Sequence, residues 1–557
     1  MKALRPALAA LLLTGCGAAP GSSQGGSSMN ATPREDAVIY FGATVHTLDP
    51  AHPHAKGVRV ENGRITHVFD GDPVDSLSGR RVNLHGAAIL PGLVDAHLHL
   101  RSLGAAQREV DLRGTTSVAD IASRIREAAK QAPAGAWIRG RGWDQNDWDK
   151  PMFPTHAALD EAAPGHPIWL ERVDGHAVWV SGSVLTLAGV GDATKSPAGG
   201  EILRDDKGAP TGVFVDNAVN LIAEKLPPAS PAELRADLEK GMDLCRRAGL
   251  TGVHDMGTDP AALRELQALE KEGKLTLRVY AYLGGDWPSV EALLHAPKGP
   301  ADSLVRVMGI KLFADGALGS RGAALLAPYS DRPDTSGLLV TPAEELYRRA
   351  KIAHDAGYDV TIHAIGDKGN RVALDTLARV EGQDRSHHHR VEHAQVVSPE
   401  DIPRFSSLGV IASMQPTHAT SDMPWAEARV GADRIKGAYA WRTMLRAGAT
   451  LVFGSDAPVE DENPWYGVYA AVTRTDAKGS PRGGWRPEER LDVMEAITAF
   501  SCTPDEIAGA KDLGVIKPGA VADLTIVAAD PALVPPEALR NMRTLRTVVG
   551  GREVYSE

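Results

Sequence analysis

Cysteine is scarce in this chain. Three cysteines, Cys16, Cys245 and Cys502, occur among 557 residues. Cys245 and Cys502 lie in apolar stretches that we expect to be helical, so we predict no disulfide framework.

Positive charge is also in short supply. The formal net charge is −11, and no block of Lys and Arg or interleaved aromatic patch occurs. These absences exclude a nucleic-acid partner. Beyond the N-terminal region, no apolar run reaches the roughly 20 residues of a membrane-spanning helix. Gly316 and Gly319 lack a Walker pattern around them, which favours a turn over a phosphate cradle.

The N-terminus has the pattern of an export signal. Lys2 and Arg5 precede the apolar run 7–13, and small residues then lead to Cys16. The arrangement resembles a bacterial lipoprotein signal over residues 1–15, with Cys16 lipidated and 16–35 as a flexible tether. An ordinary cleaved signal is the alternative. We therefore expect a lipoprotein of the bacterial cell envelope that contacts the membrane through its lipid anchor only.

The middle of the chain alternates strand-like and helical patterns. Eight strand-like runs recur, at 89–99, 252–256, 277–283, 305–313, 359–363, 390–393, 410–415 and 451–455. Helical patterns at 231–248, 343–356 and 488–500 separate some of them. This α/β alternation predicts a (β/α)8 TIM barrel over 89–504, with an insertion at about 114–230, better than a doubly wound sheet.

Short alternating strands with Gly and Asn turns occur at both ends of the chain. They occupy 37–47, 58–60, 65–69, 523–527 and 545–554. We predict that 36–88 and 505–557 form one small β-sandwich domain.

Two histidines end the first barrel strand, in Asp95-Ala96-His97-Leu98-His99. Alternate side chains of a strand share a face, so His97 and His99 can hold one metal ion through neutral imidazoles. Two surface histidines closing a strand are the structural alternative.

Later strands end in further polar residues that could join these histidines. The carboxyl ends of barrel strands meet at one face, where active sites lie. Any one of these groups could be a satisfied core or surface residue, but a common location at six positions favours a metal centre. The expected ligands are His97, His99, Lys311, His363, His393 and Asp456.

Lys311 needs a separate explanation, because an ammonium group cannot bind a metal ion. Its neutral amine can react with carbon dioxide to give a carbamate whose two oxygens bridge two divalent ions. In the alternative, Lys311 pairs with Asp315 or Asp456 and binds substrate beside a single metal.

These residues resemble the metal-ligand pattern of the amidohydrolase superfamily, over about 38–554. More narrowly, the chain is similar to the YtcJ-like amidohydrolases, which include N-substituted formamide deformylase. The narrower resemblance depends on motifs at 142–146, 167–170, 174–179, 199–202, 311–316 and 454–458.

The resemblance implies hydrolysis of a carbon–nitrogen bond other than a peptide bond. One or two divalent ions, with Zn²⁺ expected, would activate a water against a carbonyl carbon. Asp456 would be the catalytic group that moves the proton. An esterase or lactonase with the same metals, or a non-catalytic solute-binding lipoprotein, stays open as an alternative.

We expect a small-molecule substrate, and a homodimer stays open. Side chains of the insertion and of the loop after the lysine strand are candidates for binding the substrate. They are Trp143, Asp144, Arg172, His176, Asp315 and Ser320. Core packing is the alternative for Trp143. His254 could reach the site or only support it, and His387-His388-His389 is more typical of a solvated tract than of a metal site.

Overall fold

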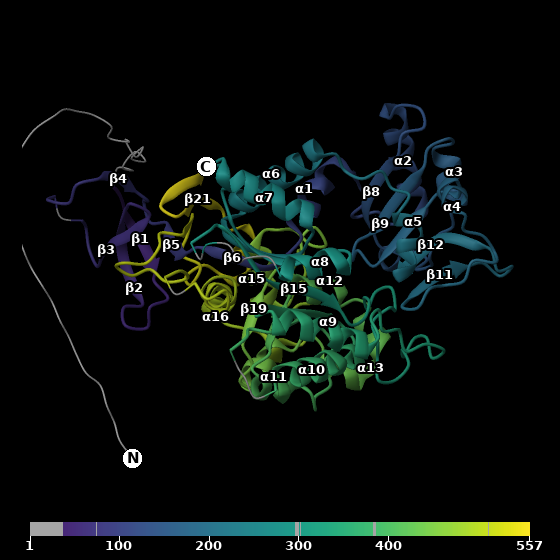
Figure 1. The fold of residues 1–557 in the computed structure, drawn as a ribbon. Coiled ribbons are helices and arrows are strands. Elements are labelled where there is room, and N and C mark those ends of the chain that lie inside the picture. Colours follow the sequence, from purple (N-terminus) through teal and green to yellow (C-terminus); the bar gives the residue numbers. More distant parts are fainter. Residues whose placement is uncertain (1–36, 74, 296–299, 301, 383–385, 511) are drawn as a thin grey trace, which may run out of the picture.

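The computed structural model describes residues 37–557 except 74, 296–299, 301, 383–385 and 511. It has three sheets. A central barrel lies between a sheet formed by both chain ends and a separate insertion, on opposite sides of the barrel in Figure 1. The predicted export signal, Cys16 and the tether lie outside the described residues. Among the described residues, no helix combines the length and apolar character needed to cross a bilayer.

Eight parallel strands form the barrel, and the predicted (β/α)8 fold is confirmed. Each strand pairs in parallel with its neighbour in chain order, from β6 to β19. Seven of the eight predicted strands lie within two residues of their observed positions. The strands are β6 (Leu93–Leu98), β13 (Leu250–Thr258), β14 (Arg278–Leu283), β15 (Val305–Phe313), β16 (Asp359–Ala364), β17 (Arg390–His393), β18 (Ile411–Met414) and β19 (Leu451–Phe453).

The last and first strands, β19 and β6, meet at the seam of the barrel. The seam is joined just beyond β19, where the Asp456 amide donates to the His97 carbonyl at 2.7 Å and the His99 amide donates to the Ala457 carbonyl at 2.8 Å. Gly454 permits this close approach, because a Cβ there would lie 2.4 Å from the His97 nitrogen. The seam therefore brings strand-one histidines beside Asp456.

Helices cover the outside of the barrel. The predicted helix 231–248 matches α6 (Pro231–Ala248), which starts with a capping box between Ser230 and Glu233 and ends at Gly249 with φ 96°. The predicted helix 488–500 is shorter in the structure, because Asp492 caps a new helix, α16 (Val493–Ala499). The other helices after the insertion are α7 (Pro260–Lys271), α8 (Trp287–Leu294), α9 (Ala343–Asp355), α10 (Asp367–Glu381), α11 (Ile402–Leu408), α12 (Pro416–Asp422), α13 (Ala426–Arg434), α14 (Trp441–Arg446), α15 (Pro464–Thr473) and α17 (Cys502–Ile507).

Strands from both chain ends form one mixed sheet, as predicted for the small β-domain. C-terminal β20 pairs with N-terminal β5, which joins the two halves. The predicted first barrel strand, 89–99, divides at Gly92: its first part is β5 in this sheet, and its second part is β6. The strands are β1 (Val38–His46), β2 (His54–Glu61), β3 (Arg64–Phe69), β4 (Arg80–Asn83), β5 (Ala88–Pro91), β20 (Leu524–Val527), β21 (Thr544–Val549) and β22 (Arg552–Ser556).

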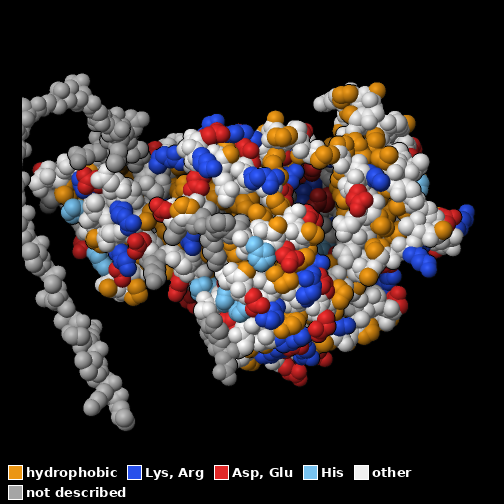
Figure 2. Space-filling view, viewed as in Figure 1, with side chains coloured by type: hydrophobic (Ala, Val, Ile, Leu, Met, Phe, Trp, Pro, Cys, Tyr) orange, Lys and Arg blue, Asp and Glu red, His pale blue; other side chains and the backbone are white. Residues whose placement is uncertain are grey.

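The insertion follows the first barrel strand and the short helix α1 (Leu100–Ala105). It is a six-stranded sheet with its own apolar cores and the helices α2 (Val118–Gln131), α3 (Ala157–Ala162), α4 (Gly182–Ala188) and α5 (Asn220–Ala223). Its strands are β7 (Val110–Asp111), β8 (Ile138–Trp143), β9 (Ile168–Arg172), β10 (Ala177–Val180), β11 (Gly200–Arg204) and β12 (Pro210–Asp216). Acidic and basic side chains are interspersed over the face in Figure 2.

Candidate active site

The structure brings the six predicted metal-site residues together at the carboxyl ends of the barrel strands. One ligand atom each from His97, His393 and Asp456 lies within 4.8 Å of the others. The remaining three residues adjoin this group. His99 lies 3.1 Å from Asp456, the Lys311 amine lies 3.4 Å from His97, and the ring centroids of His363 and His393 are 4.5 Å apart.

A buried carboxylate orients His97. Its Nδ1 lies 2.6 Å from Glu392 Oε2, and both side chains are fully buried. The N–H therefore lies on Nδ1, and the lone pair of Nε2 is free to bind a cation. Arg390 holds Glu392 in turn, through a contact of 2.9 Å. This buried ion pair fixes the tautomer of a candidate metal ligand.

An amide orients His393 in the same way. His393 Nδ1 lies 2.8 Å from Gln415 Oε1, which can only accept, so Nε2 again carries the free lone pair. His393 has φ 72° and Asp456 has φ 61°, a region that non-glycine residues rarely adopt. Strained backbone of this kind clusters at functional sites, because the surrounding structure must hold it.

Asp456 is the centre of the cluster. Its Oδ1 lies 3.1 Å from His99 Nε2 and 3.4 Å from His97 Nε2, and its Oδ2 lies 3.6 Å from His418 Nε2. Burial opposes the charge on this carboxyl, but the histidines around it hold its pKa well below the usual range. Asp456 is therefore ionised at neutral pH.

Lys311 is buried among these groups without a carboxylate at ion-pair distance among the described residues. Burial is the main cause that lowers the pKa of its amine to about 8, against the opposing effect of the Glu392 and Asp456 charges. The amine therefore loses its proton more readily than an exposed lysine, although the charged form still predominates at neutral pH. The alternative pairing of Lys311 with Asp315 is not formed, because Asp315 accepts backbone N–H groups of Ala324, Ile365 and Gly366 instead.

The donor set fits a divalent cation. Burial lowers the pKa of His97, His363 and His393 well below the usual range, and the Lys311 charge adds to the effect. The rings are therefore neutral, as metal binding requires. Neutral imidazoles, one carboxylate and an amine that can be converted to an anion are ligands of the kind that Zn²⁺ accepts.

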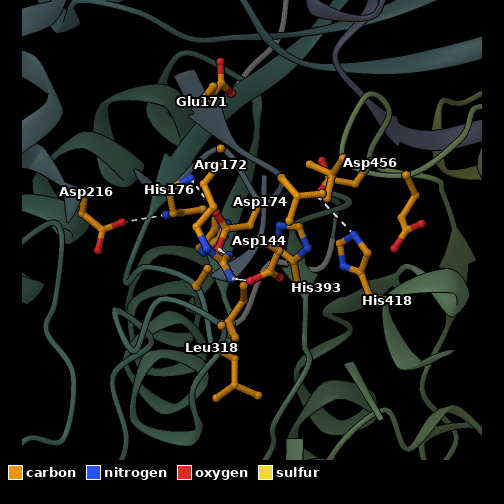
Figure 3. Close-up of a pocket in the computed structure, with 18 of the residues that line it drawn as sticks. Asp144, Glu171, Arg172, Asp174, His176, Asp216, Leu318, His393, His418 and Asp456 are labelled. Atoms are coloured by element: carbon orange, nitrogen blue, oxygen red, sulfur yellow. Dashed lines mark hydrogen bonds and ion pairs between the residues drawn. The ribbon is translucent and has the colours of Figure 1, made fainter. Parts of the chain in front are cut away.

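A cavity of about 570 Å³ opens above this cluster, between barrel and insertion. Figure 3 shows Arg172, Asp174 and His176 of the insertion on one side, and His393, His418 and Asp456 of the barrel on the other. The insertion therefore supplies one wall of the cavity.

Ion pairs stiffen that wall. Arg172, which is almost fully buried, pairs with both Asp144 and Asp174. His176 Nδ1 lies 2.7 Å from Asp216 at the end of β12. Burial opposes the charge on His176, but the bond to Asp216 and its carboxylate charge raise the pKa of the ring. Cationic and anionic groups thus face the metal site across the cavity.

The structure separates the six predicted substrate-binding residues into two groups. Asp144, Arg172 and His176 line the cavity. Trp143, Asp315 and Ser320 are not on its wall. Trp143 donates its indole N–H to Leu170 and packs in the insertion core, Asp315 organises the loop after β15, and Ser320 is buried against the Ala317 carbonyl.

Sequence reasoning missed three residues that hold the site: His418, Glu392 and Asp216. Glu392 immediately precedes His393, so a polar run inside a buried strand was a readable signal. His418 lies on α12 and Asp216 at the end of an insertion strand, where no strand-end pattern points to them. Gly316 also has a role beyond the predicted turn, since a Cβ there would lie 2.3 Å from Asp216.

The structure also locates the other histidines that the sequence analysis considered. His254 is buried inside the barrel and contacts Arg390 through Nδ1 at 2.9 Å, so it supports the Arg390–Glu392 pair without reaching the cavity. The expectation of a solvated His387–His389 tract is wrong for His389, which is 3% exposed. This residue accepts the Val360 amide and lies against Glu381 at the opposite end of the barrel.

Fold and site together define a metal-dependent hydrolase of the amidohydrolase class. The model of the Amidohydrolase family matches residues 80–555, and the chain belongs to this family. It is 33% identical to YtcJ of Bacillus subtilis (strain 168), over 93% of this chain and 99% of YtcJ. N-substituted formamide deformylase of Arthrobacter pascens is more distant, at 27% identity over 92% of this chain and 97% of that protein.

Solved structures agree with this assignment. A metal-dependent hydrolase from Pyrococcus horikoshii OT3 is 29% identical and superposes with a TM-score of 0.73, over 90% of this chain and 99% of that one. A metal-dependent hydrolase from Pyrococcus furiosus, also 29% identical, gives a TM-score of 0.69 over 89% of this chain and all of that one.

Proposed function

We propose that this protein hydrolyses a non-peptide, amide-like carbon–nitrogen bond in a small molecule. The observation that carries the proposal is the convergence of His97, His393 and Asp456 around one point, with ligand atoms within 4.8 Å of one another. Family membership supports hydrolysis, and the similarity to N-substituted formamide deformylase supports an amide-like bond. The products would be a carboxylic acid and an amine.

One or two divalent ions, with Zn²⁺ as our choice, would be held by His97, His99, Lys311, His363, His393 and Asp456. Such an ion supplies an activated water and polarises the carbonyl group that is attacked. Residues of the chain would move the proton and orient the ligands.

Asp456 has the position and charge to move the proton. Asp456 is ionised at neutral pH, lines the cavity beside His418 and would accept a proton from an activated water. The carboxylate would then pass the proton to the leaving nitrogen. Glu392 and Gln415 keep the lone pairs of His97 and His393 directed at the centre throughout.

We also propose that Lys311 is carboxylated. A bond forms between its neutral amine nitrogen and the carbon of CO₂, and one proton leaves to solvent, giving a carbamate anion. The lowered pKa and the absence of a carboxylate at ion-pair distance from Lys311 among the described residues support this step. A crystal grown with bicarbonate should show additional density on Nζ, whereas unmodified Lys311 beside two fully occupied metals would contradict it.

A small-molecule substrate fits the cavity. A volume of about 570 Å³ lies in the usual range of small-molecule sites. We propose that Asp144, Arg172 and His176 position the substrate from the insertion side. Arg172 is already paired with two carboxylates, so His176 is the more accessible anchor.

The test combines metal quantification with a hydrolysis screen over N-formyl, N-acyl, cyclic amide, ester and lactone compounds. We expect bound zinc and turnover of amide-like compounds by the wild type. Turnover confined to esters or lactones would replace the amide assignment, and zinc without any turnover would favour solute binding. The variant Asp456→Asn should lose turnover, and Asp422→Asn is its matched control. Asp422 is also a carboxylate of the cavity, but it bonds Tyr439 and none of the proposed metal ligands.

We propose in addition that the protein is an exported lipoprotein of the bacterial cell envelope, anchored through Cys16, and that its body need not enter the membrane. Fractionation of the wild type and a Cys16→Ser variant tests this. Loss of membrane association in the variant is expected, and equal release of both proteins would contradict the anchor.

Sedimentation of the body tests whether it forms a homodimer.

A further inference from the structure

A second histidine cluster lies at the opposite end of the barrel from the proposed active site. His354 is in the last turn of α9, Glu381 is the last residue of α10, and His387 and His389 immediately precede β17. One ligand atom of each lies within 4.8 Å of the others. Three segments that approach the amino ends of β16 and β17 therefore meet at these four side chains.

The spacing of the ligand atoms matches a coordination sphere. Glu381 Oε2 lies 3.7 Å from His354 Nδ1 and 3.7 Å from His387 Nδ1. With Zn–N distances near 2.0–2.1 Å, the ligands of a tetrahedral zinc are separated by about 3.3 Å. Two of the three distances therefore exceed this separation by about 0.4 Å, and the third, between His354 and His387, is no longer than 4.8 Å.

His389 has a different role in the cluster, which its hydrogen bonds define. The Val360 amide donates to His389 Nδ1 at 3.0 Å, so the proton of the neutral ring is on Nε2. Nε2 lies 2.8 Å from Glu381 and 3.2 Å from His354 Nδ1. His389 therefore orients the carboxylate as a donor and does not itself offer a lone pair, which leaves three ligands and an open position.

The electrostatic surroundings favour a cation. Helices α9 and α10 both end at the cluster, and a helix carboxyl end carries a partial negative charge. Glu381 is 7% exposed and adds a full negative charge when ionised. The side chains of His354 and His387 are each 15% exposed, so ions can reach them from solvent. Ser386 Oγ, 3.4 Å from His387 Nδ1, is a weak contact that a metal could replace.

We propose that His354, Glu381 and His387 form a structural Zn²⁺ site that joins α9 and α10 to the loop before β17. Two imidazoles and a carboxylate are ligands that zinc accepts, and a solvent molecule would fill the fourth position. The ion would fix the start of β17, the strand whose other end carries Glu392 and His393. The site is separate from the proposed hydrolytic centre and does not depend on its chemistry.

Zinc content of the full-length protein tests the proposal. Wild type, His387→Ala and His388→Ala are equilibrated at the same buffered free Zn²⁺ and analysed by mass spectrometry. We expect His387→Ala to hold one zinc fewer than the wild type. The neighbouring His388 is exposed and outside the cluster, so His388→Ala should keep the wild-type content. Equal zinc in wild type and His387→Ala at every free concentration would overturn the proposal.

Two further measurements separate this site from the hydrolytic one. Saturating Zn²⁺ should raise the Tm of a His97→Ala variant, whose hydrolytic centre is weakened, by more than it raises the Tm of the His97→Ala/His387→Ala double variant. If both Tm values rise equally, the second site does not exist. His387 lies in a loop and is partly exposed, so its removal should leave the barrel folded.

Discussion

The two ends of the barrel carry histidine clusters of similar composition but different organisation. At the carboxyl end, His97 and His393 come from strands far apart in sequence, and each has its Nδ1 occupied by a buried acceptor. At the amino end, His354, Glu381 and His387 come from consecutive segments and lie near the surface. Only the first cluster opens into the cavity of about 570 Å³.

This difference explains why the carboxyl-end cluster is the candidate active site. Similar ligand types occur at both ends, so ligand chemistry alone does not decide. The carboxyl end differs in three ways: buried partners orient its histidines, its carboxylate Asp456 is ionised, and it has space for a substrate. The amino-end cluster has helix ends and a hydrogen-bonding histidine instead, which suits a structural ion.

Asp456→Asn should produce the largest effect. The amide keeps the shape of the side chain but cannot accept the proton, so we expect kcat to fall by about 10³-fold or more with little change in Tm. Steady-state kinetics on a substrate found in the screen, with thermal unfolding alongside, measure this. Wild-type turnover in the variant would contradict the proton-transfer role.

Lys311→Met should stabilise the metal-free, CO₂-free protein at neutral pH. Burial lowers the lysine pKa from its usual 10.5 to about 8, so the unfolded chain binds more protons between these values. The cost of the buried ammonium, about 3 kcal/mol, is fully present below pH 8 and disappears as pH rises to 10.5.

Denaturant unfolding in the presence of a chelator measures this difference. The gain of the Met variant should shrink between pH 8 and pH 10.5. A gain that is the same at every pH would assign the effect to packing instead. The variant should also lack the density expected on a carboxylated side chain.

Gln415→Leu should weaken metal binding at the carboxyl end. Without the amide oxygen, His393 Nδ1 loses its acceptor and the ring loses its fixed orientation, so metal affinity should fall by about 10–100-fold. Competition with a chelator measures the affinity, and excess metal should restore turnover. Gln395→Leu is the control, because Gln395 contacts Asp422 and Tyr439 but no ligand histidine. Equal affinity in both variants would refute the orienting role.

His354→Ala should have the smallest effect on turnover. The residue lies at the amino end, away from the cavity, so kcat should stay within about twofold of the wild type when the hydrolytic centre is loaded. A large fall in kcat at unchanged Tm would show that the two ends are coupled through β17.

Most of the fold could be predicted because each barrel strand is a short apolar run bounded by turn residues. The prediction for 305–313 matches β15, and that for 231–248 matches α6. The pattern failed at Gly92, where one apolar run serves two sheets. Nothing in local hydrophobicity shows that β5 leaves the barrel to pair with β20, more than 400 residues later.

The candidate site could also be predicted only in part, because local patterns do not show contacts between distant segments. Strand-end positions located His97, His363, His393 and Asp456, because the carboxyl ends of barrel strands must converge. The same reasoning could not find His418 on a helix or Asp216 on the insertion. For Trp143 it left substrate contact and core packing open, and the ring packs inside the insertion. Contacts between separate layers depend on how the layers dock.

By itself, the sequence determined the alternation of strands and helices, the ligand types at the strand ends and their common face, because these follow from periodicity and barrel geometry. Only the tertiary structure decided which nitrogen of each histidine is free, which insertion residues face the metal centre and that His389 is buried beside Glu381. Those features depend on distances between groups distant in sequence, and such distances are fixed only when the layers pack.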